Sequence, residues 1–111
     1  MKNECKEYAQ NIANELKALY NMDDDEREKL EEDGEPSDIY GYIADALDVE
    51  YTLDSNRELI GVRLYVTLGG PTAWIDTRNG EAVCAWGGDK ESAWIPSEIC
   101  DEINEYFAEL F

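Results

Sequence analysis

Apolar residues recur every three or four positions along the first twenty residues of the chain. Glu, Lys, Gln and Asn fill most of the positions between them. Because an α-helix has 3.6 residues per turn, this spacing gathers the apolar side chains on one face. The pattern predicts an amphipathic helix over residues 3–20, whose buried face holds Cys5, Tyr8, Ala9, Ile12, Leu16, Leu19 and Tyr20.

An acidic segment separates this helix from a second, shorter one. Ten of the sixteen residues from Asp23 to Asp38 are Asp or Glu, and a Gly and a Pro interrupt them. We expect a loop here that holds a short helical turn over about residues 25–32. Ser37 is predicted to be the N-cap of the next helix. The short helix after it is predicted to end near Asp48 and to carry Ile39, Tyr40, Ile43 and Leu47.

The period of the apolar residues changes to two in the middle of the chain. Apolar and polar residues alternate over residues 49–54 and again over residues 60–68. Such alternation is typical of β-strands with one buried face. A turn at Ser55-Asn56 joins the two as antiparallel neighbours. Their buried face is predicted to hold Val49, Tyr51, Leu53, Ile60, Val62, Leu64, Val66 and Leu68.

Asn79-Gly80 is a strong signal for a two-residue hairpin turn. It lies between alternating strands at residues 73–77 and 81–86. The cross-strand pairs that follow from such a turn are Arg78 with Glu81, Asp76 with Val83, and Ile75 with Cys84.

This pairing assigns the side chains of the hairpin to two faces of the sheet. The face that we expect in the core holds Ala73, Ile75, Cys84 and Trp86. The opposite face holds Trp74, Asp76, Arg78, Glu81 and Val83. On that face, we expect Trp74 to be an exposed interface anchor, unless the sheet is covered on both sides. A turn at residues 87–89 leads to a last strand over residues 91–95, in which Trp94 can face either way.

Pro96-Ser97 predicts the start of a final helix. Its buried stripe consists of Ile99, Ile103, Tyr106, Phe107 and Leu110. An antiparallel sheet commonly buries one face and leaves the other to water. We therefore expect one α+β domain over residues 1–111, with residues 21–38 as an acidic loop or short helix insert. In it, the N-terminal and C-terminal helices pack on one face of a meander of about five antiparallel strands.

Composition excludes several classes of function. The 111 residues include 27 Asp and Glu, 9 Lys and Arg and no His, which gives a formal charge of −18. A surface this acidic repels bare nucleic acid and anionic membranes, so we expect direct binding to neither. Without His, the commonest general base and zinc ligand are missing. We therefore expect no enzyme, no catalytic residues, no metal site and no cofactor. A hydrophobic content of 43% still predicts a folded chain.

The cysteines and the N-terminus indicate a cytoplasmic protein. Cys5, Cys84 and Cys100 form no Cys-x-x-Cys motif and lie beside apolar residues, which is typical of reduced, buried thiols. Glu4 and Glu7 stand where a signal peptide is basic or apolar. No apolar run reaches the roughly 20 residues of a transmembrane helix.

The chain contains the residue types needed for three other kinds of site, but it lacks the sequence motif of each. Two carboxylates could form a glycosidase-like dyad, yet no motif singles out a pair. The acidic segment lacks the Asp-x-Asp-x-Asp-Gly register of a calcium-binding EF-hand. Gly69-Gly70-Pro71 is not followed by the Gly-Lys-Ser/Thr of a phosphate loop, so it predicts a strand end instead.

The acidic residues gather in two places. One set consists of Asp23, Asp24, Asp25, Glu26, Glu28, Glu31, Glu32 and Asp33. The other advances by three or four positions along the final helix as Glu98, Glu102, Glu105 and Glu109, with no Lys or Arg after Lys90. These helical carboxylates are roughly 4.5–6 Å apart along the axis, which is on the order of the charge spacing in a nucleic-acid strand.

So much charge calls for an explanation beyond solubility, because a net charge of about 2 to 8 suffices for that in a small domain. We predict that both acidic sets, together with Trp74 and Asp76, bind a strongly basic partner surface. Charge complementarity makes such an affinity fall with salt.

Four motifs carry a resemblance to a known group of proteins: Gly69-Gly70-Pro71, Ile75-Asp76-Thr77, Trp86-Gly87-Gly88-Asp89 and Ile103-Asn104-Glu105-Tyr106-Phe107. With them, the segment from about Tyr42 to Leu110 resembles small, acidic, uncharacterised bacterial proteins that recur on phages and conjugative elements. The motifs look structural, so the resemblance assigns no site residue. It implies a mobile-element setting, in which small acidic proteins are often anti-CRISPR or anti-restriction inhibitors.

The expected function is that of a non-enzymatic nucleic-acid mimic. Its expected partner is a basic nucleic-acid-binding protein, namely a CRISPR effector or a restriction enzyme. The alternative is a general protein-interaction or dimerising domain that forms a homodimer through its Trp74 face, with the acids as a solubilising coat. A small-molecule enzyme needs a well-formed pocket with a perturbed carboxylate.

Overall fold

Five strands form one antiparallel sheet in the computed structural model of this chain, which describes residues 4–109. Each strand is hydrogen-bonded to the next one along the chain, so the sheet is a simple meander. The strands are β1 (Asp48–Leu53), β2 (Leu59–Thr67), β3 (Thr72–Asp76), β4 (Glu81–Trp86) and β5 (Asp89–Trp94). The α+β meander that the alternation predicts is confirmed.

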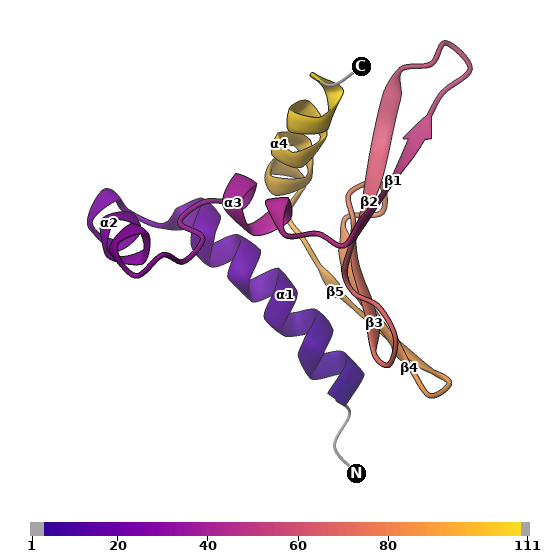
Figure 1. The fold of residues 1–111 in the computed structure, drawn as a ribbon. Helices are drawn as coiled ribbons and strands as arrows, with labels where there is room; N and C mark the ends of the chain where they lie inside the picture. Colours follow the sequence, from indigo (N-terminus) through magenta and orange to yellow (C-terminus); the bar gives the residue numbers. More distant parts are fainter. Residues whose placement is uncertain (1–3, 110–111) are drawn as a thin grey trace.

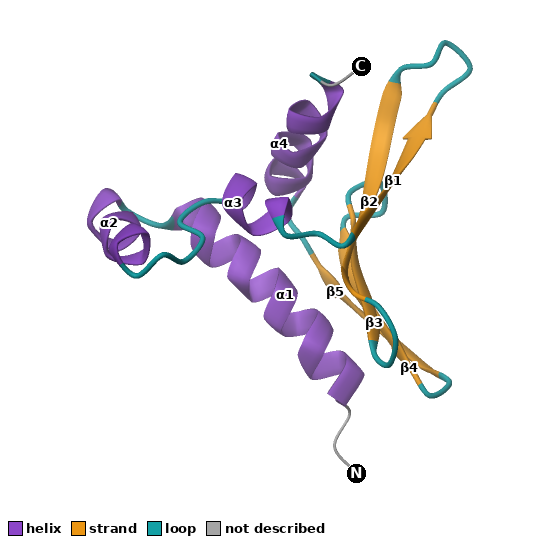
Figure 2. Cartoon of the chain, in the orientation of Figure 1, coloured by secondary structure: helices purple, strands orange, loops and turns teal. Residues whose placement is uncertain are grey.

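The helices lie on one side of this sheet (Figures 1 and 2). They are α1 (Glu4–Asn21), α2 (Asp24–Glu32), α3 (Ile39–Ala44) and α4 (Ser97–Ala108). α1 packs mainly on β4 and β5, whereas α4 packs on β2. The predicted packing of the terminal helices on one face is therefore confirmed. Within the described residues, no helix covers the opposite face (Figure 2), which we call the open face.

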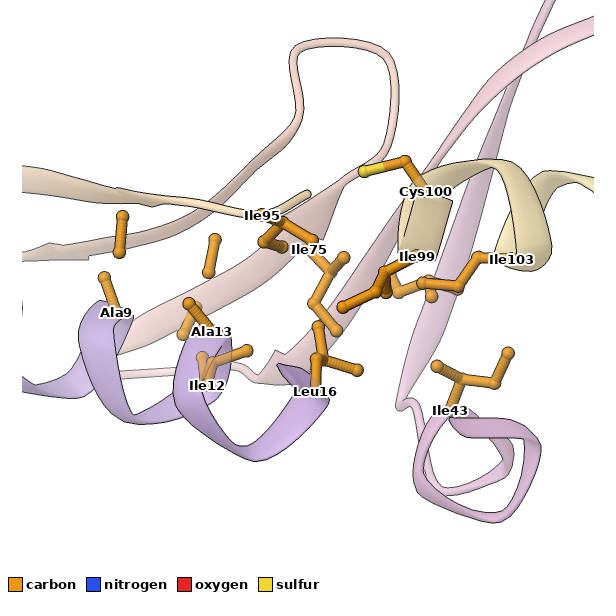
Figure 3. Packing of buried hydrophobic residues seen from close by; sticks show 14 of the residues in the cluster. Ala9, Ile12, Ala13, Leu16, Ile43, Ile75, Ile95, Ile99, Cys100 and Ile103 are labelled. Carbon is orange, nitrogen blue, oxygen red and sulfur yellow. The ribbon is translucent and has the colours of Figure 1, made fainter. Parts of the chain in front are cut away.

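The core forms where the apolar stripes of α1 and α4 meet the inner face of the sheet (Figure 3). Ala9 and Ala13 of α1 are fully buried, and their small side chains let the helix approach the strands closely. The predicted stripe on α1 is buried except at Tyr8, which is partly covered, and at Tyr20. Tyr20 is exposed because the end of α1 runs away from the sheet toward α2 (Figure 1).

One of the two short helices agrees with the prediction and the other differs from it. The short helix predicted over about residues 25–32 is confirmed as α2, whose N-cap Asp23 accepts a hydrogen bond from the backbone N of Glu26 at 2.8 Å. α3 is capped by Asp38 rather than Ser37, since the Asp38 carboxylate reaches the backbone N of Gly41 at 2.7 Å. α3 also ends at Ala44, short of Asp48.

Leu47 consequently does not belong to a helix. Its backbone N donates to the carbonyl of Tyr65 at 2.8 Å, which extends the pairing of β1 with β2. Its side chain is 62% exposed. The Asp38 cap explains where α3 begins, because a carboxylate in this position satisfies free N–H groups of the first turn.

The predicted buried face of β1 and β2 is confirmed only at its centre. Val62 and Leu64 are buried, whereas Leu53, Ile60 and Leu68 are exposed. Leu53 and Ile60 lie near the outer end of the β1–β2 hairpin, which extends beyond the helices and has no helix to cover it (Figure 1). Leu68 follows the opposite end of β2. Tyr51, in β1, is partly covered by the ring of Phe107, with ring centroids 5.9 Å apart.

The β3–β4 turn contains four residues, so the predicted two-residue turn is wrong. Asp76 pairs with Glu81, and Ile75 with Ala82. Asp76 causes the difference, because its carboxylate accepts hydrogen bonds from the backbone N of Arg78 and Asn79 at 3.0 and 3.1 Å. An Asp side chain that accepts these backbone hydrogen bonds stabilises the four-residue turn in place of the two-residue turn.

A shift of two residues leaves the faces of a strand unchanged. Ala73, Ile75 and Cys84 are therefore in the core, as predicted. Trp86 is not, since it is 45% exposed. The described part of α1 begins at Glu4, and Cys5 already packs on Cys84, so Trp86 lies beyond the first turn of the helix.

The turn also folds back onto β2. The Thr77 hydroxyl accepts from the backbone N of Val62 at 2.9 Å and donates to the Asn104 side chain at 2.7 Å, which links the turn to α4. A Cβ at Gly61 would lie 2.7 Å from the Cβ of Arg78. Glycine is therefore required at position 61 for this close approach.

The final helix begins at Ser97, as predicted, and buries Ile99, Ile103 and Phe107. Tyr106 is instead 39% exposed and packs on Tyr40, with ring centroids 5.3 Å apart. Leu110 lies outside the described residues, as does Asn3 at the start of the first helix. Between residues 4 and 109, no helix is long and apolar enough to span a membrane.

Candidate acidic binding surface

Every acidic residue from Asp23 to Asp33 is exposed, and α2 has no buried residue. Arg27 points the other way. Its two terminal nitrogens donate to the carbonyls of Ser37 and Leu19 at 2.6 and 2.8 Å, which ties α2 to its neighbours. With Arg27 occupied internally, Lys29 is the exposed cation among the acids on the outer surface of α2.

The predicted ridge on α4 is also at the surface. Glu98, Glu105 and Glu109 are exposed, and Glu102 is partly buried. Glu102 accepts a hydrogen bond from the hydroxyl of Tyr40 on α3. The ridge therefore borders α3, the helix that follows the acidic segment in the chain.

α2, α3 and α4 border a shared hollow of about 110 Å³, which is lined by Arg27 of α2, by Asp38 and by Glu102 of α4. The side chain that α2 contributes is the cation Arg27 and not one of its acids. Tyr40 bonds Glu102 beside this hollow. The pKa of Tyr40 is raised by its hydrogen bond to Glu102, then by burial, and then by the negative charges of Glu102, Glu105 and Asp38.

We call the acids of these segments, with Tyr40 as the hydrogen-bond partner of Glu102, the acidic surface. It consists of Asp23, Asp24, Asp25, Glu26, Glu28, Glu31, Glu32, Asp33, Asp38, Tyr40, Glu98, Glu102, Glu105 and Glu109.

Trp74 lies away from the acidic surface, on the open face of the sheet. The cationic groups of Arg63 and Lys90 are 5.2 and 5.8 Å from its ring centroid. Tyr65 packs beside it, with ring centroids 5.9 Å apart. Trp74 is only partly exposed, because these neighbours cover it. It is therefore separate from the predicted acidic site and is less accessible than a bare interface anchor.

Asp76 does not fit the predicted role of a partner-binding acid. Its side chain is 9% exposed and lies 3.7 Å from Nη2 of Arg63. Its oxygens also hold the β3–β4 turn, including the side-chain nitrogen of Asn79 at 3.0 Å. Because the carboxylate is buried and internally bonded, we leave Asp76 out of the binding surface.

The structure settles where the other two tryptophans lie. Trp94, whose direction the sequence left open, is 67% exposed at the edge strand β5, with Nζ of Lys17 5.3 Å from its ring centroid. Trp86 is exposed at the end of β4. Neither belongs to the acidic surface.

The predicted burial of the three cysteines is confirmed. Sγ of Cys84 is 2.9 Å from Sγ of Cys5. Burial, with a contribution from Cys5, raises the pKa of Cys84 to about 12. Burial likewise raises the pKa of Cys100, to about 11. At neutral pH these thiols are protonated and poor nucleophiles.

In the part of the chain that the structure describes, no group of three or more Cys, Asp or Glu side chains is arranged to hold a metal ion. The acids of α2 diverge around a helix, so they do not converge on a shared point.

Sequence reasoning missed Asp38, Tyr40 and Arg27 as parts of the site. Asp38 could have been included because it ends the acidic segment. Tyr40 could not have been identified, because its part in the site depends on α4 lying beside α3.

Comparison of the chain with family models, with curated proteins and with solved structures gives no significant match.

Proposed function

We propose that this protein is a non-enzymatic inhibitor that presents its acidic surface to a strongly basic protein as a mimic of nucleic acid. The proposed partner is a nuclease of bacterial host defence, either a CRISPR effector or a restriction enzyme, whose nucleic-acid channel is lined with Lys and Arg. The exposure of nearly all the acids on α2 and α4 supports this proposal most, since every acid from Asp23 to Asp33 and three of the four on α4 are open to solvent.

The energetics of the surface favour a binding role over a simple coat. Like charges three or four positions apart destabilise a helix by a few tenths of a kcal/mol per pair. Spreading the same acids over the molecule would avoid this cost and would give the same solubility. A concentrated anionic region speeds association with a cationic channel and makes the affinity depend on salt.

Matched charge variants test the proposal. The first variant combines Glu28→Gln, Glu31→Gln and Glu32→Gln on α2, and the second combines Glu98→Gln, Glu105→Gln and Glu109→Gln on α4. The control combines Asp48→Asn, Glu58→Gln and Asp89→Asn, which are exposed acids of the β-hairpins. All three variants lose three negative charges, so only the position of the charge differs.

The measurement is inhibition of DNA cleavage by a panel of purified CRISPR effectors and restriction enzymes, at low and high salt. We expect the wild type and the control to inhibit at least one nuclease, and both acidic-surface variants to inhibit it at least about tenfold less well. The proposal is wrong if the three variants inhibit equally well, or if salt does not weaken inhibition by the wild type.

A second candidate function rests on the open face. Trp74 and Tyr65 are partly exposed on it, and Trp94 is exposed on the edge strand β5. Such surfaces serve as protein interfaces, so a dimerising domain is the alternative. Light scattering separates the two, because a dimer that is lost in both Trp74→Ala and Trp94→Ala favours this alternative.

A further inference from the structure

A separate pocket of about 370 Å³ lies between α1, α3 and β2. It is formed by Tyr8, Ile12 and Glu15 of α1, by Asp45 at the end of α3, and by Val66 at the β2 bulge. Its size is within the range of pockets that bind small molecules or single side chains. None of its residues belongs to the acidic surface.

The lining combines three kinds of side chain. Ile12 and Val66 are apolar, Tyr8 and Tyr42 are aromatic, and Glu15 and Asp45 are carboxylates. Among the residues that the structure describes, no Lys or Arg lines this pocket. Its two negative charges are therefore not neutralised from within it.

Tyr42 has a defined state in the pocket. Burial and a hydrogen bond to the Glu15 carboxylate raise the pKa of Tyr42, and the nearby Tyr8 contributes in the same direction. The Tyr42 hydroxyl is consequently protonated at neutral pH and donates to Glu15. The formal charge of the pocket therefore resides on its two carboxylates.

Aromatic rings beside carboxylates are the chemistry that recognises organic cations. The face of a tyrosine ring attracts an ammonium or guanidinium group, and such groups occur in aromatic cages. A carboxylate adds a charge-assisted hydrogen bond, and the apolar residues suit the methylene stem of Lys or Arg.

We propose that this pocket binds the guanidinium or ammonium group of a single Arg or Lys side chain. The inference rests on the proposed function, because it names the anchor that a basic partner inserts beside the acidic surface. Pro36 and Asp45 of the lining flank α3, the helix that also carries Tyr40 of the acidic surface. A basic partner that covers the acidic surface therefore has this pocket within reach of a neighbouring side chain.

The test uses small probes that need no partner protein. N-acetyl-arginine amide and N-acetyl-lysine amide are titrated into the folded protein, and N-acetyl-citrulline amide serves as the neutral analogue of arginine. Spermidine forms a further arm, which distinguishes a free polyamine from a protein side chain. The readout is the NMR chemical shift of the Ile12 and Val66 methyl groups.

Two variants locate the binding. Glu15→Gln with Asp45→Asn removes both carboxylates, and Glu58→Gln with Asp89→Asn removes the same charge from distant hairpin positions. We expect millimolar binding of the arginine or lysine probe by the wild type and the control, and binding about three- to tenfold weaker in the pocket variant. Tyr8→Leu should weaken it about two- to fivefold.

The proposal fails if citrulline amide shifts the methyl signals as the cationic probes do, or if the pocket variant and the control bind alike. It also fails in its choice of ligand if spermidine binds and the amino-acid probes do not. A folded backbone spectrum for each variant excludes loss of structure. Because these probes report on the pocket alone, the outcome is independent of the nuclease assay, and either proposal can fail without the other.

Discussion

The helical side and the open face of this molecule use charge in opposite ways. On the helical side, acids are exposed and have few cationic neighbours, so their charge is directed outward. On the open face, Asp76 is buried against Arg63, and Arg63 and Lys90 cover Trp74. Acids stabilise the fold on both sides, through the Asp23 and Asp38 caps and through Asp76, but most acids of α2 and α4 are exposed to solvent.

This difference teaches that a count of acids does not identify a binding site. Asp76 and Glu28 are equivalent in composition, yet one closes a turn and the other is exposed to solvent on α2. What separates them is the number of hydrogen bonds that each carboxylate makes within the chain. The predictions below test this contrast from the largest expected effect to the smallest.

Removal of the Asp76 carboxylate should give the largest effect. In Asp76→Ala, the N–H groups of Arg78 and Asn79 lose their acceptor and Arg63 loses its ion pair. We expect the free energy of unfolding to fall by about 2–4 kcal/mol, measured by urea denaturation. Glu28→Gln is the control and should change it by less than about 0.5 kcal/mol. Equal losses of stability in the two variants would contradict the contrast between the enclosed Asp76 and the exposed Glu28.

Truncation of Trp74 should have the next largest effect. The ring is partly buried among Tyr65, Arg63 and Lys90, so Trp74→Ala should cost about 2 kcal/mol of stability, less than a fully buried aromatic residue. Trp94→Ala, at a 67% exposed position, should cost under about 1 kcal/mol. A larger loss from Trp94 than from Trp74 would contradict the described packing. Thermal unfolding followed by circular dichroism measures both.

Alkaline pH should destabilise the core by a smaller amount. The pKa of Cys100 is raised from an ordinary value of 9.0 to about 11 in the folded chain. The folded state therefore holds this proton more tightly than the unfolded state, so stability is complete below pH 9 and is lost as the pH rises toward 11. We expect a contribution of about 1 kcal/mol between pH 8 and pH 10.

Denaturation of Cys100→Ala over the same pH range measures this contribution. The variant should be less stable than the wild type at pH 8, since it loses packing, but its stability should depend less on pH. Parallel pH dependence in the two proteins would show that Cys100 is not responsible.

Neutralising one acid on α4 should give the smallest effect, with the opposite sign. Glu105 is within three or four positions of Asp101, Glu102 and Glu109, so Glu105→Gln should stabilise the protein by about 0.5 kcal/mol at low salt. The gain should shrink as salt is added. On the open face, Arg63→Gln should destabilise instead. A stabilising Arg63→Gln would mean that the two sides do not differ.

Sequence patterns predicted most of the fold because each pattern reflects local geometry. The 3.6-residue spacing on α1 and the alternation in β2 describe which side chains share a face, and only one arrangement buries both. The predictions failed where a single side chain altered a boundary. Asp38 replaced Ser37 as a cap, and Asp76 converted a two-residue turn into one of four.

The candidate site was less predictable than the fold. The acids of α2 and α4 were identified from the sequence, but Tyr40, Arg27 and the pocket at Tyr42 were not. Tyr40 and the pocket depend on elements that are distant in the chain and adjacent in space. Arg27 bonds carbonyls only eight and ten residues away, but its direction depends on how α2 folds back between them. Trp86 was assigned to the core because periodicity does not indicate where the covering helix begins.

The sequence by itself determined the elements, the two-layer arrangement and the excess of negative charge, because periodicity and composition are properties of neighbouring residues. Only the tertiary structure decided that Tyr40 of α3 bonds Glu102 of α4, that Asp76 is enclosed, and that the open face is lined by Trp74 with its cations. The physical reason is that burial and pairing depend on which elements pack together. Long-range packing is set by the whole core and not by any one segment.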